Sequence, residues 1–190
     1  MPKIADIQET PNPNAVKFIL KEPMSYGTSH SFKSAEEAGT DEFAKSIFDV
    51  GEVVSVFYMD KMVTVEKTDE AEWDEILPEL AVPIRAAEPV RSINGNGNGN
   101  AAKAIGGTLG AILDDDPVVR EINALLDERI RPYLAGDGGW LEVVGFEDKT
   151  LRIRYEGACG SCPSSLTGTL MAIENMIRDE IDPEITVIAI

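Results

Sequence analysis

The sequence predicts an α/β (α+β) protein of two small domains, residues 1–93 and 114–190, joined by a flexible linker over residues 94–113. Three observations lead to this prediction. Short runs of β-branched and aromatic residues are typical of strands, apolar residues recur at helical spacing between them, and an alternating Asn-Gly stretch has no apolar period. A chain of 190 residues is long enough for one ordinary domain or two small ones.

In the first domain, residues 16–20, 53–58 and 62–66 are predicted strands, because each run is rich in β-branched or aromatic side chains. The last two are close enough to form a hairpin. Residues 41–50 predict a helix with an acidic start, and a second helix is expected to begin near Thr68 and to be kinked or shortened by its two prolines. The apolar face of this second helix is expected to consist of Trp73, Leu77, Leu80 and Ile84.

In the second domain, Pro117 follows three aspartates, which is typical of a capped helix start, and Pro132 is expected to end or kink that helix. The predicted apolar face of the helix comprises Val119, Ile122, Leu126, Ile130 and Tyr133. The predicted order is helix, strand, strand, helix and strand, with a hairpin over residues 141–146 and 151–155, a helix from Pro163 and a buried strand over residues 185–190.

Composition excludes several classes of function. The chain has 34 acidic and 17 basic residues, a net charge of −17, so a nucleic-acid partner is not expected. We find no uncharged apolar run of bilayer length and no secretion signal, and two cysteines cannot form a disulfide framework. These features predict a cytoplasmic protein without a membrane partner. The acidic clusters fall on helices with an apolar opposite face, which favours a solvated surface over catalytic carboxylates, and the chain is not expected to be an enzyme.

Both cysteines, Cys159 and Cys162, lie in a Gly- and Ser-rich turn between a predicted strand and the helix from Pro163. Cysteines at this spacing can direct both sulfurs to one metal centre, and the start of the helix favours the thiolate form that binds metal. Iron–sulfur clusters and structural zinc usually require four protein ligands. The single histidine, His30, lies in a polar stretch where a surface or loop role is expected, so two chains would have to meet as a homodimer.

The Cys-x-x-Cys pattern alone leaves other interpretations open. A structural zinc ion shared by a dimeric adaptor needs the same number of thiols. A dithiol–disulfide redox pair is less well matched, because the residues between the cysteines are Gly160 and Ser161 rather than a pair that includes proline. Two cysteines without a special role form the remaining alternative.

At these residues the sequence resembles the Nfu family of iron–sulfur cluster carriers, whose C-terminal module is similar to the C-terminal domain of NifU. In the C-terminal half, the resemblance is found in residues 131–134, in Asp137-Gly138-Gly139 and in Gly157-x-Cys159-x-x-Cys162-Pro163-Ser164-Ser165. In the N-terminal half, it is found in Thr10-Pro11-Asn12-Pro13-Asn14, in Lys17-Phe18 and in Val53-x-Ser55-Val56-Phe57. Together these motifs extend over nearly the whole chain outside the linker.

The resemblance implies a scaffold that binds a 4Fe–4S cluster, or a 2Fe–2S cluster, between two subunits through Cys159 and Cys162. It implies cluster donor proteins and apo iron–sulfur proteins as partners. The N-terminal domain is predicted to recognise these partners. One residue departs from the family: Trp140 follows Asp137-Gly138-Gly139, where an acidic residue is common. We expect these three residues to form a turn that needs a positive φ and Trp140 to pack against the hairpin.

Overall fold

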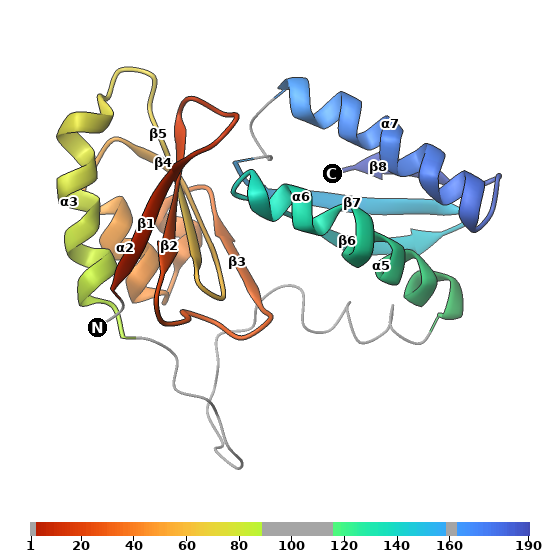
Figure 1. Cartoon of the computed structure of the whole chain (residues 1–190), viewed down its shortest axis with the longest axis horizontal. Coiled ribbons are helices and arrows are strands. Elements are labelled where there is room, and N and C mark those ends of the chain that lie inside the picture. Colours follow the sequence, from red (N-terminus) through yellow and green to blue (C-terminus); the bar gives the residue numbers. More distant parts are fainter. Residues whose placement is uncertain (1–2, 89–115, 159–162) are drawn as a thin grey trace, which may run out of the picture. The chain divides into compact units, whose positions relative to one another are not determined.

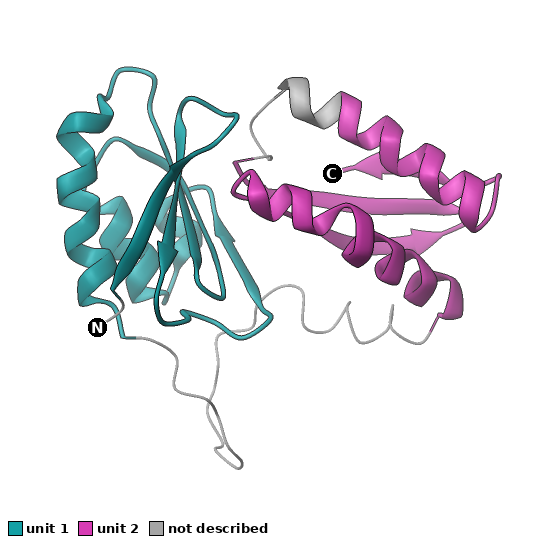
Figure 2. Cartoon of the chain, viewed as in Figure 1, with its two compact units in different colours: residues 1–102 teal, residues 103–190 magenta. Residues whose placement is uncertain are grey.

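The computed structural model describes residues 3–88, 116–158 and 163–190 of the chain. It divides into two compact units, residues 1–102 and 103–190, which are called here the N-terminal and the C-terminal unit (Figure 2). Each unit combines helices with one β-sheet, which confirms the predicted α+β class. The linker predicted over residues 94–113 lies outside the described residues.

The N-terminal unit is built on a five-stranded antiparallel sheet with the strand order β1-β2-β5-β4-β3 (Figure 1). Its strands are β1 (Ile4–Glu9), β2 (Ala15–Leu20), β3 (Ser29–Phe32), β4 (Val53–Met59) and β5 (Met62–Lys67). Its helices are α1 (Ala35–Ala38), α2 (Glu42–Phe48) and α3 (Trp73–Ala86). Helices α2 and α3 pack against each other and against one face of the sheet.

Period-two patterning explains the core of this unit. In β2, Val16, Phe18 and Leu20 all lie in the core shared with the helices, because alternate residues of a strand point to the same face. Leu80 and Ile84, one helical turn apart in α3, meet them from the helix layer, and both are fully buried. A helix layer thus covers one face of the sheet.

The three strands predicted in this unit are confirmed as β2, β4 and β5, and the predicted hairpin is confirmed between β4 and β5. The predicted start of the second helix at Thr68 is wrong, since α3 begins at Trp73 and continues through Pro78 and Pro83. Strands β1 and β3 were not predicted. Both are sheet edges in which at least half of the residues are polar or charged, so neither has a continuous apolar pattern.

The C-terminal unit has a three-stranded sheet of order β6-β7-β8 with its helices on one face (Figure 1). Its elements are α5 (Pro117–Arg129), α6 (Arg131–Gly136), β6 (Gly139–Glu147), β7 (Thr150–Gly157), α7 (Pro163–Glu180) and β8 (Thr186–Ala189). Strands β6 and β7 form the predicted hairpin, and β8 runs parallel to β7. The predicted order of elements is therefore confirmed, with the first helix divided in two near Pro132.

Two details of this unit were predicted wrongly. Tyr133 is 75% exposed, because the break at Ile130 turns α6 so that Leu134 enters the core instead. The last strand was expected to be buried, but β8 is an edge strand in which only Val187 is buried. No helix among the described residues is both long and apolar enough to cross a bilayer.

Side chains from the helices form hydrogen bonds with backbone groups at both edges of this sheet. At the β6 edge, Arg131 Nε donates to the backbone oxygen of Leu141 at 3.0 Å. At the β8 edge, Arg178 Nε donates to the backbone oxygen of Ile185 at 2.7 Å, and the backbone N–H of Val187 donates to Glu174 Oε2 at 2.8 Å. These contacts occupy backbone groups that an edge strand otherwise leaves open to pairing with another chain.

Candidate functional site

The two cysteines predicted to bind a metal or cluster, Cys159 and Cys162, lie outside the described residues. The structure does describe the elements on both sides of them. Strand β7 ends at Gly157, and α7 begins at Pro163. The predicted placement of the cysteines between a strand and a helix is therefore confirmed, while their own geometry stays a prediction.

The backbone on the strand side of the cysteines is held by a turn from another part of the unit. The backbone N–H of Ala158 donates to the backbone oxygen of Gly138 at 3.2 Å, and Ala158 is 2% exposed. Gly139 is the cross-strand partner of Gly157. The residue directly before Cys159 is thus attached to the turn between α6 and β6.

Positive φ angles shape both segments at this contact. Gly138 has φ 79° and Gly157 has φ 67°, a region that glycine adopts without the steric penalty of a Cβ atom. The prediction of a turn that needs a positive φ is confirmed at Gly138. Sequence analysis identified these glycines but not their partners, because the turn and the cysteine segment are about twenty residues apart in the chain.

Arg131 joins three elements around this turn. All three of its guanidinium nitrogens donate hydrogen bonds: Nε to the oxygen of Leu141, Nη1 to Asp127 Oδ1 at 2.7 Å, and Nη2 to Asn123 Oδ1 at 2.9 Å. Its Cζ atom lies 5.3 Å from the ring centroid of Trp140, a cation–π distance. Trp140 was expected to pack against the hairpin, but it is itself part of β6, and its ring contacts Arg131, the first residue of α6.

Glu156, in the last part of β7, is a further residue of this region that sequence analysis missed. It is only 6% exposed and lies three residues before Cys159. It faces Trp140 across the hairpin register. A charged residue on the outward phase of an alternating strand is expected to be solvated, so the pattern contained no signal for its burial.

His30, for which a surface or loop role was expected, lies half-buried in the edge strand β3. Its ring stacks on Tyr58 with 4.5 Å between centroids and 10° between planes. Burial lowers the pKa of His30, and the nearby Asp41 carboxylate partly opposes this shift. Among the described residues, no group of three or more His, Cys, Asp or Glu side chains is placed to hold a metal ion.

The motif at residues 10–14 forms a tied loop between β1 and β2. The backbone N–H of Asn14 donates to Asn12 Oδ1 at 3.0 Å, and Trp73 Nε1 donates to the backbone oxygen of Pro13 at 2.9 Å. The ammonium group of Lys67 donates to Asn14 Oδ1 at 3.2 Å and lies 5.5 Å from the centroid of the Trp73 ring. These contacts attach the loop to β5 and α3, which explains the motif by its structural role.

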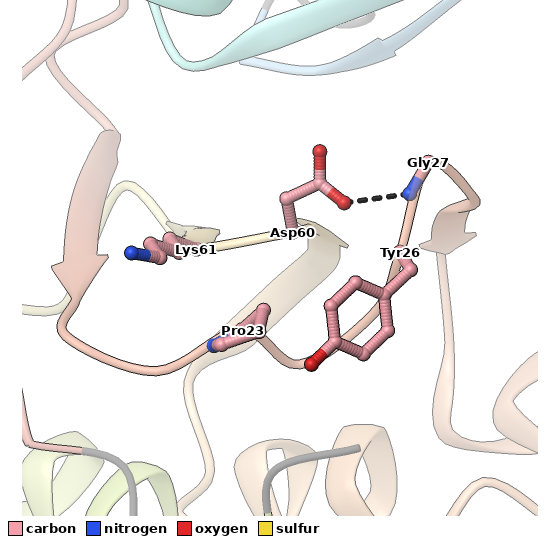
Figure 3. Close-up of a pocket in the computed structure, with 5 residues that line it drawn as sticks. All are labelled: Pro23, Tyr26, Gly27, Asp60 and Lys61. Atoms are coloured by element: carbon pink, nitrogen blue, oxygen red, sulfur yellow. Dashed lines mark hydrogen bonds between the residues drawn. The ribbon is translucent and has the colours of Figure 1, made fainter. Parts of the chain in front are cut away.

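An open hollow of about 510 Å³ lies at the turn between β4 and β5 (Figure 3). Its lining residues are Pro23, Tyr26, Gly27, Asp60 and Lys61. The carboxylate of Asp60 accepts a hydrogen bond from the backbone N–H of Gly27 at 2.7 Å, so it holds the loop that forms the wall. These residues do not pair a nucleophile with a base and do not form a metal-ligand set, and the hollow is not a candidate active site.

Comparison with known protein families gives one match for each unit. The model described as "NifU-like domain" matches residues 122–188, a range that includes both cysteines. The model described as "Scaffold protein Nfu/NifU N terminal" matches residues 4–87. The chain belongs to the Nfu family. The resemblance inferred from the sequence motifs is therefore confirmed over both units.

Two named relatives illustrate the similarity of this Nfu chain to known proteins. A Drosophila ananassae protein named "NFU1 iron-sulfur cluster scaffold homolog, mitochondrial" is 35% identical over 173 residues, covering 90% of this chain and 58% of the relative. An Arabidopsis thaliana protein named "NifU-like protein 5, mitochondrial" is 36% identical over 174 residues, covering 90% of this chain and 62% of the relative. The chain thus spans about three-fifths of each relative.

The predicted cytoplasmic location is wrong by this comparison. Both relatives are named as mitochondrial proteins, which points to the mitochondrion rather than the cytoplasm. The original prediction rested on the lack of a secretion signal and on the small number of cysteines. Those features distinguish reducing from oxidising compartments, and they do not distinguish one reducing compartment from another.

Proposed function

We propose that this Nfu chain is a scaffold and carrier that binds a 4Fe–4S cluster between two copies of itself and transfers it to apo-proteins. The ligands are Cys159 and Cys162 of each copy, and the cluster is cargo received from a donor protein. Binding and handing on a preformed cluster needs no catalytic nucleophile, so the chain does not act as an enzyme. The observation that carries the proposal is the NifU-like match over residues 122–188, which includes both thiols.

The described structure around the cysteines supports this role. Pro163 begins an α-helix of 18 residues, whose N-terminal partial positive charge favours thiolates in the segment before it. On the other side, the residue directly before Cys159 is fixed, since Ala158 is buried and its backbone N–H donates to the Gly138 oxygen. A cluster ligated by two thiolates from each chain, at the seam between two copies, is exposed enough to be passed on.

Anaerobic reconstitution with iron and sulfide tests the proposal. The native chain is expected to gain visible absorption, four irons per two chains for a 4Fe–4S cluster, and the mass of a dimer. Cys159→Ser and Cys162→Ser are expected to lose all three properties, while Ser164→Ala, a neighbouring change that removes no thiol, is expected to keep them. A monomer that holds a complete cluster, or a native chain that takes up zinc but no iron, would contradict the proposal.

The N-terminal unit has no predicted cluster ligand, and we propose that it recognises donors or acceptors of the cluster. Its core is separate from that of the C-terminal unit, so deletion of residues 1–93 leaves an intact set of core residues around the cysteines. The deletion is expected to preserve reconstitution and to slow transfer to at least some acceptors. Unchanged transfer to every apo-protein tried would refute this role.

A further inference from the structure

We propose that Arg131 and Trp140 are positioning residues for the cysteine segment, an inference that rests on the proposed function of Cys159 and Cys162. They fix the turn between α6 and β6, whose Gly138 oxygen holds the backbone directly before Cys159. In this chain the aromatic ring at position 140 is therefore part of an arrangement that orients the cluster ligands.

The side chain of Arg131 ties together α5, α6 and β6. Its side chain is 11% exposed, and its three donor nitrogens reach Asn123 and Asp127 of α5 and the backbone of β6. The ring of Trp140 adds a fourth contact at 5.3 Å. A planar guanidinium group whose three nitrogens all donate hydrogen bonds holds its partners in one arrangement. The ammonium group of a lysine, on a flexible stem, does not do so.

The chain segment between Arg131 and Trp140 is held at both of its ends. Residue 131 begins α6 and residue 140 is the second residue of β6, so both ends of the intervening segment are joined to each other through one side chain. Only Asp137 and Gly138 lie between α6 and β6. The Gly138 oxygen that accepts from the Ala158 N–H at 3.2 Å is therefore carried on a segment tied at both ends.

Val119 provides a control that separates positioning of the turn from general stabilisation of the unit. Val119 is fully buried at the start of α5, at the opposite end of that helix from Arg131. Truncation of Val119 weakens the core without touching the turn. If Arg131 and Trp140 acted only through overall stability, a Val119 variant of equal stability would disturb the cysteine segment as much as an Arg131 variant does.

The first measurement is hydrogen exchange at the Ala158 amide in the cluster-free full-length chain. Arg131→Lys keeps the positive charge but removes the planar guanidinium group. The loss of a charge-assisted hydrogen bond is expected to speed exchange of the Ala158 amide roughly tenfold relative to exchange of the Ile153 amide in the middle of β7. Trp140→Ala is expected to act in the same direction, and Trp140→Phe, which restores a ring, is expected to recover part of the protection. Arg129→Lys, the same change in an exposed ion pair with Glu180, is the matched control.

The second measurement is the loss of the cluster from the reconstituted chain to a chelator, together with its visible circular dichroism. Arg131→Lys and Trp140→Ala are expected to lose the cluster at least about fivefold faster, with an altered spectrum, while Val119→Ala and Arg129→Lys retain native rates and spectra. The inference is overturned if Ala158 exchange is unchanged in Arg131→Lys, or if Val119→Ala reproduces its effects. A native chain that binds no cluster but shows the predicted Ala158 exchange refutes the proposed function and leaves the positioning contact established.

Discussion

Tyr58→Phe is the substitution that isolates one polar contact in the N-terminal unit. It removes the phenol O–H that donates to Asp41 Oδ2 at 2.6 Å. The ring remains, so the stack on His30 and the edge contact with Phe43, whose centroid lies 5.2 Å away, are preserved. Asp41 also caps α2 by accepting from the backbone N–H of Ala44 at 2.8 Å. The lost contact therefore joins strand β4 to the start of α2.

The magnitude follows from the charge and exposure of the partners. Hydrogen bonds to a charged group stabilise proteins by about 1.5–3 kcal/mol. Asp41 is only half-buried and keeps the Ala44 N–H, and water can replace part of what it loses. We therefore expect the free energy of unfolding of this unit to fall by about 1.5 kcal/mol, the lower end of that range.

Urea denaturation followed by Trp73 fluorescence measures this change, in a Trp140→Phe background so that only the N-terminal unit reports. A double-mutant cycle with Asp41→Asn should show that most of the loss is shared by the pair. Above pH 10 a second signature is expected. Burial, with Asp41 as a further cause, raises the pKa of Tyr58, so the unfolded state loses its proton first and stability falls as pH rises. Tyr58→Phe should remove that fall. A loss below about 0.5 kcal/mol, or no coupling with Asp41, would refute the reasoning.

Three further outcomes are expected. Burial lowers the pKa of His30, so the unfolded state binds more protons than the folded state below pH 6.5. The free energy of unfolding should therefore fall with decreasing pH, by less than about 1.4 kcal/mol per pH unit. His30→Gln should reduce this pH dependence, measured as the urea midpoint between about pH 5.5 and 7. Arg178→Leu frees the Ile185 oxygen at the β8 edge and should promote self-association in sedimentation; a fully monomeric variant would contradict this. Gly138→Ala should lower the free energy of unfolding, followed by Trp140 fluorescence, by about 1–2 kcal/mol, because φ at this position is 79°, and Gly138→Asn should lower it less. Equal stability of the native chain and both variants would exclude backbone strain at Gly138.

Sequence analysis predicted the elements whose apolar pattern is strong. Strands β2, β4 and β5 are rich in β-branched or aromatic residues and each buries at least three side chains, and α5 has both a capping aspartate and a proline at its start. The edge strands β1 and β3 were missed for the opposite reason. One face of an edge strand and one of its sides are open to water, so selection for apolar residues there is weak.

Helix limits and faces were predicted less well. Helix α3 begins only at Trp73, because the residues directly after β5 are held by other contacts. The backbone N–H of Thr68 donates to the Glu52 oxygen at 2.8 Å, and the Asn14 amide donates to Asp69. Tyr133 continues the apolar spacing of α5, but a break at Ile130 changes the phase of the helix. The local apolar pattern specifies neither the start of α3 nor the break at Ile130, because both depend on contacts between distant residues.

The sequence by itself determined the membership in a family, the two units and the pair of thiols, because motif spacing and apolar periodicity are properties of residues near one another in the chain. Only the tertiary structure decided that Arg131 and Trp140 meet, that Gly138 holds Ala158, and that Glu156 is buried beside them. Such contacts join segments up to about twenty-five residues apart, and their energies depend on register and side-chain direction. These are set when the whole unit packs, and no local pattern specifies them.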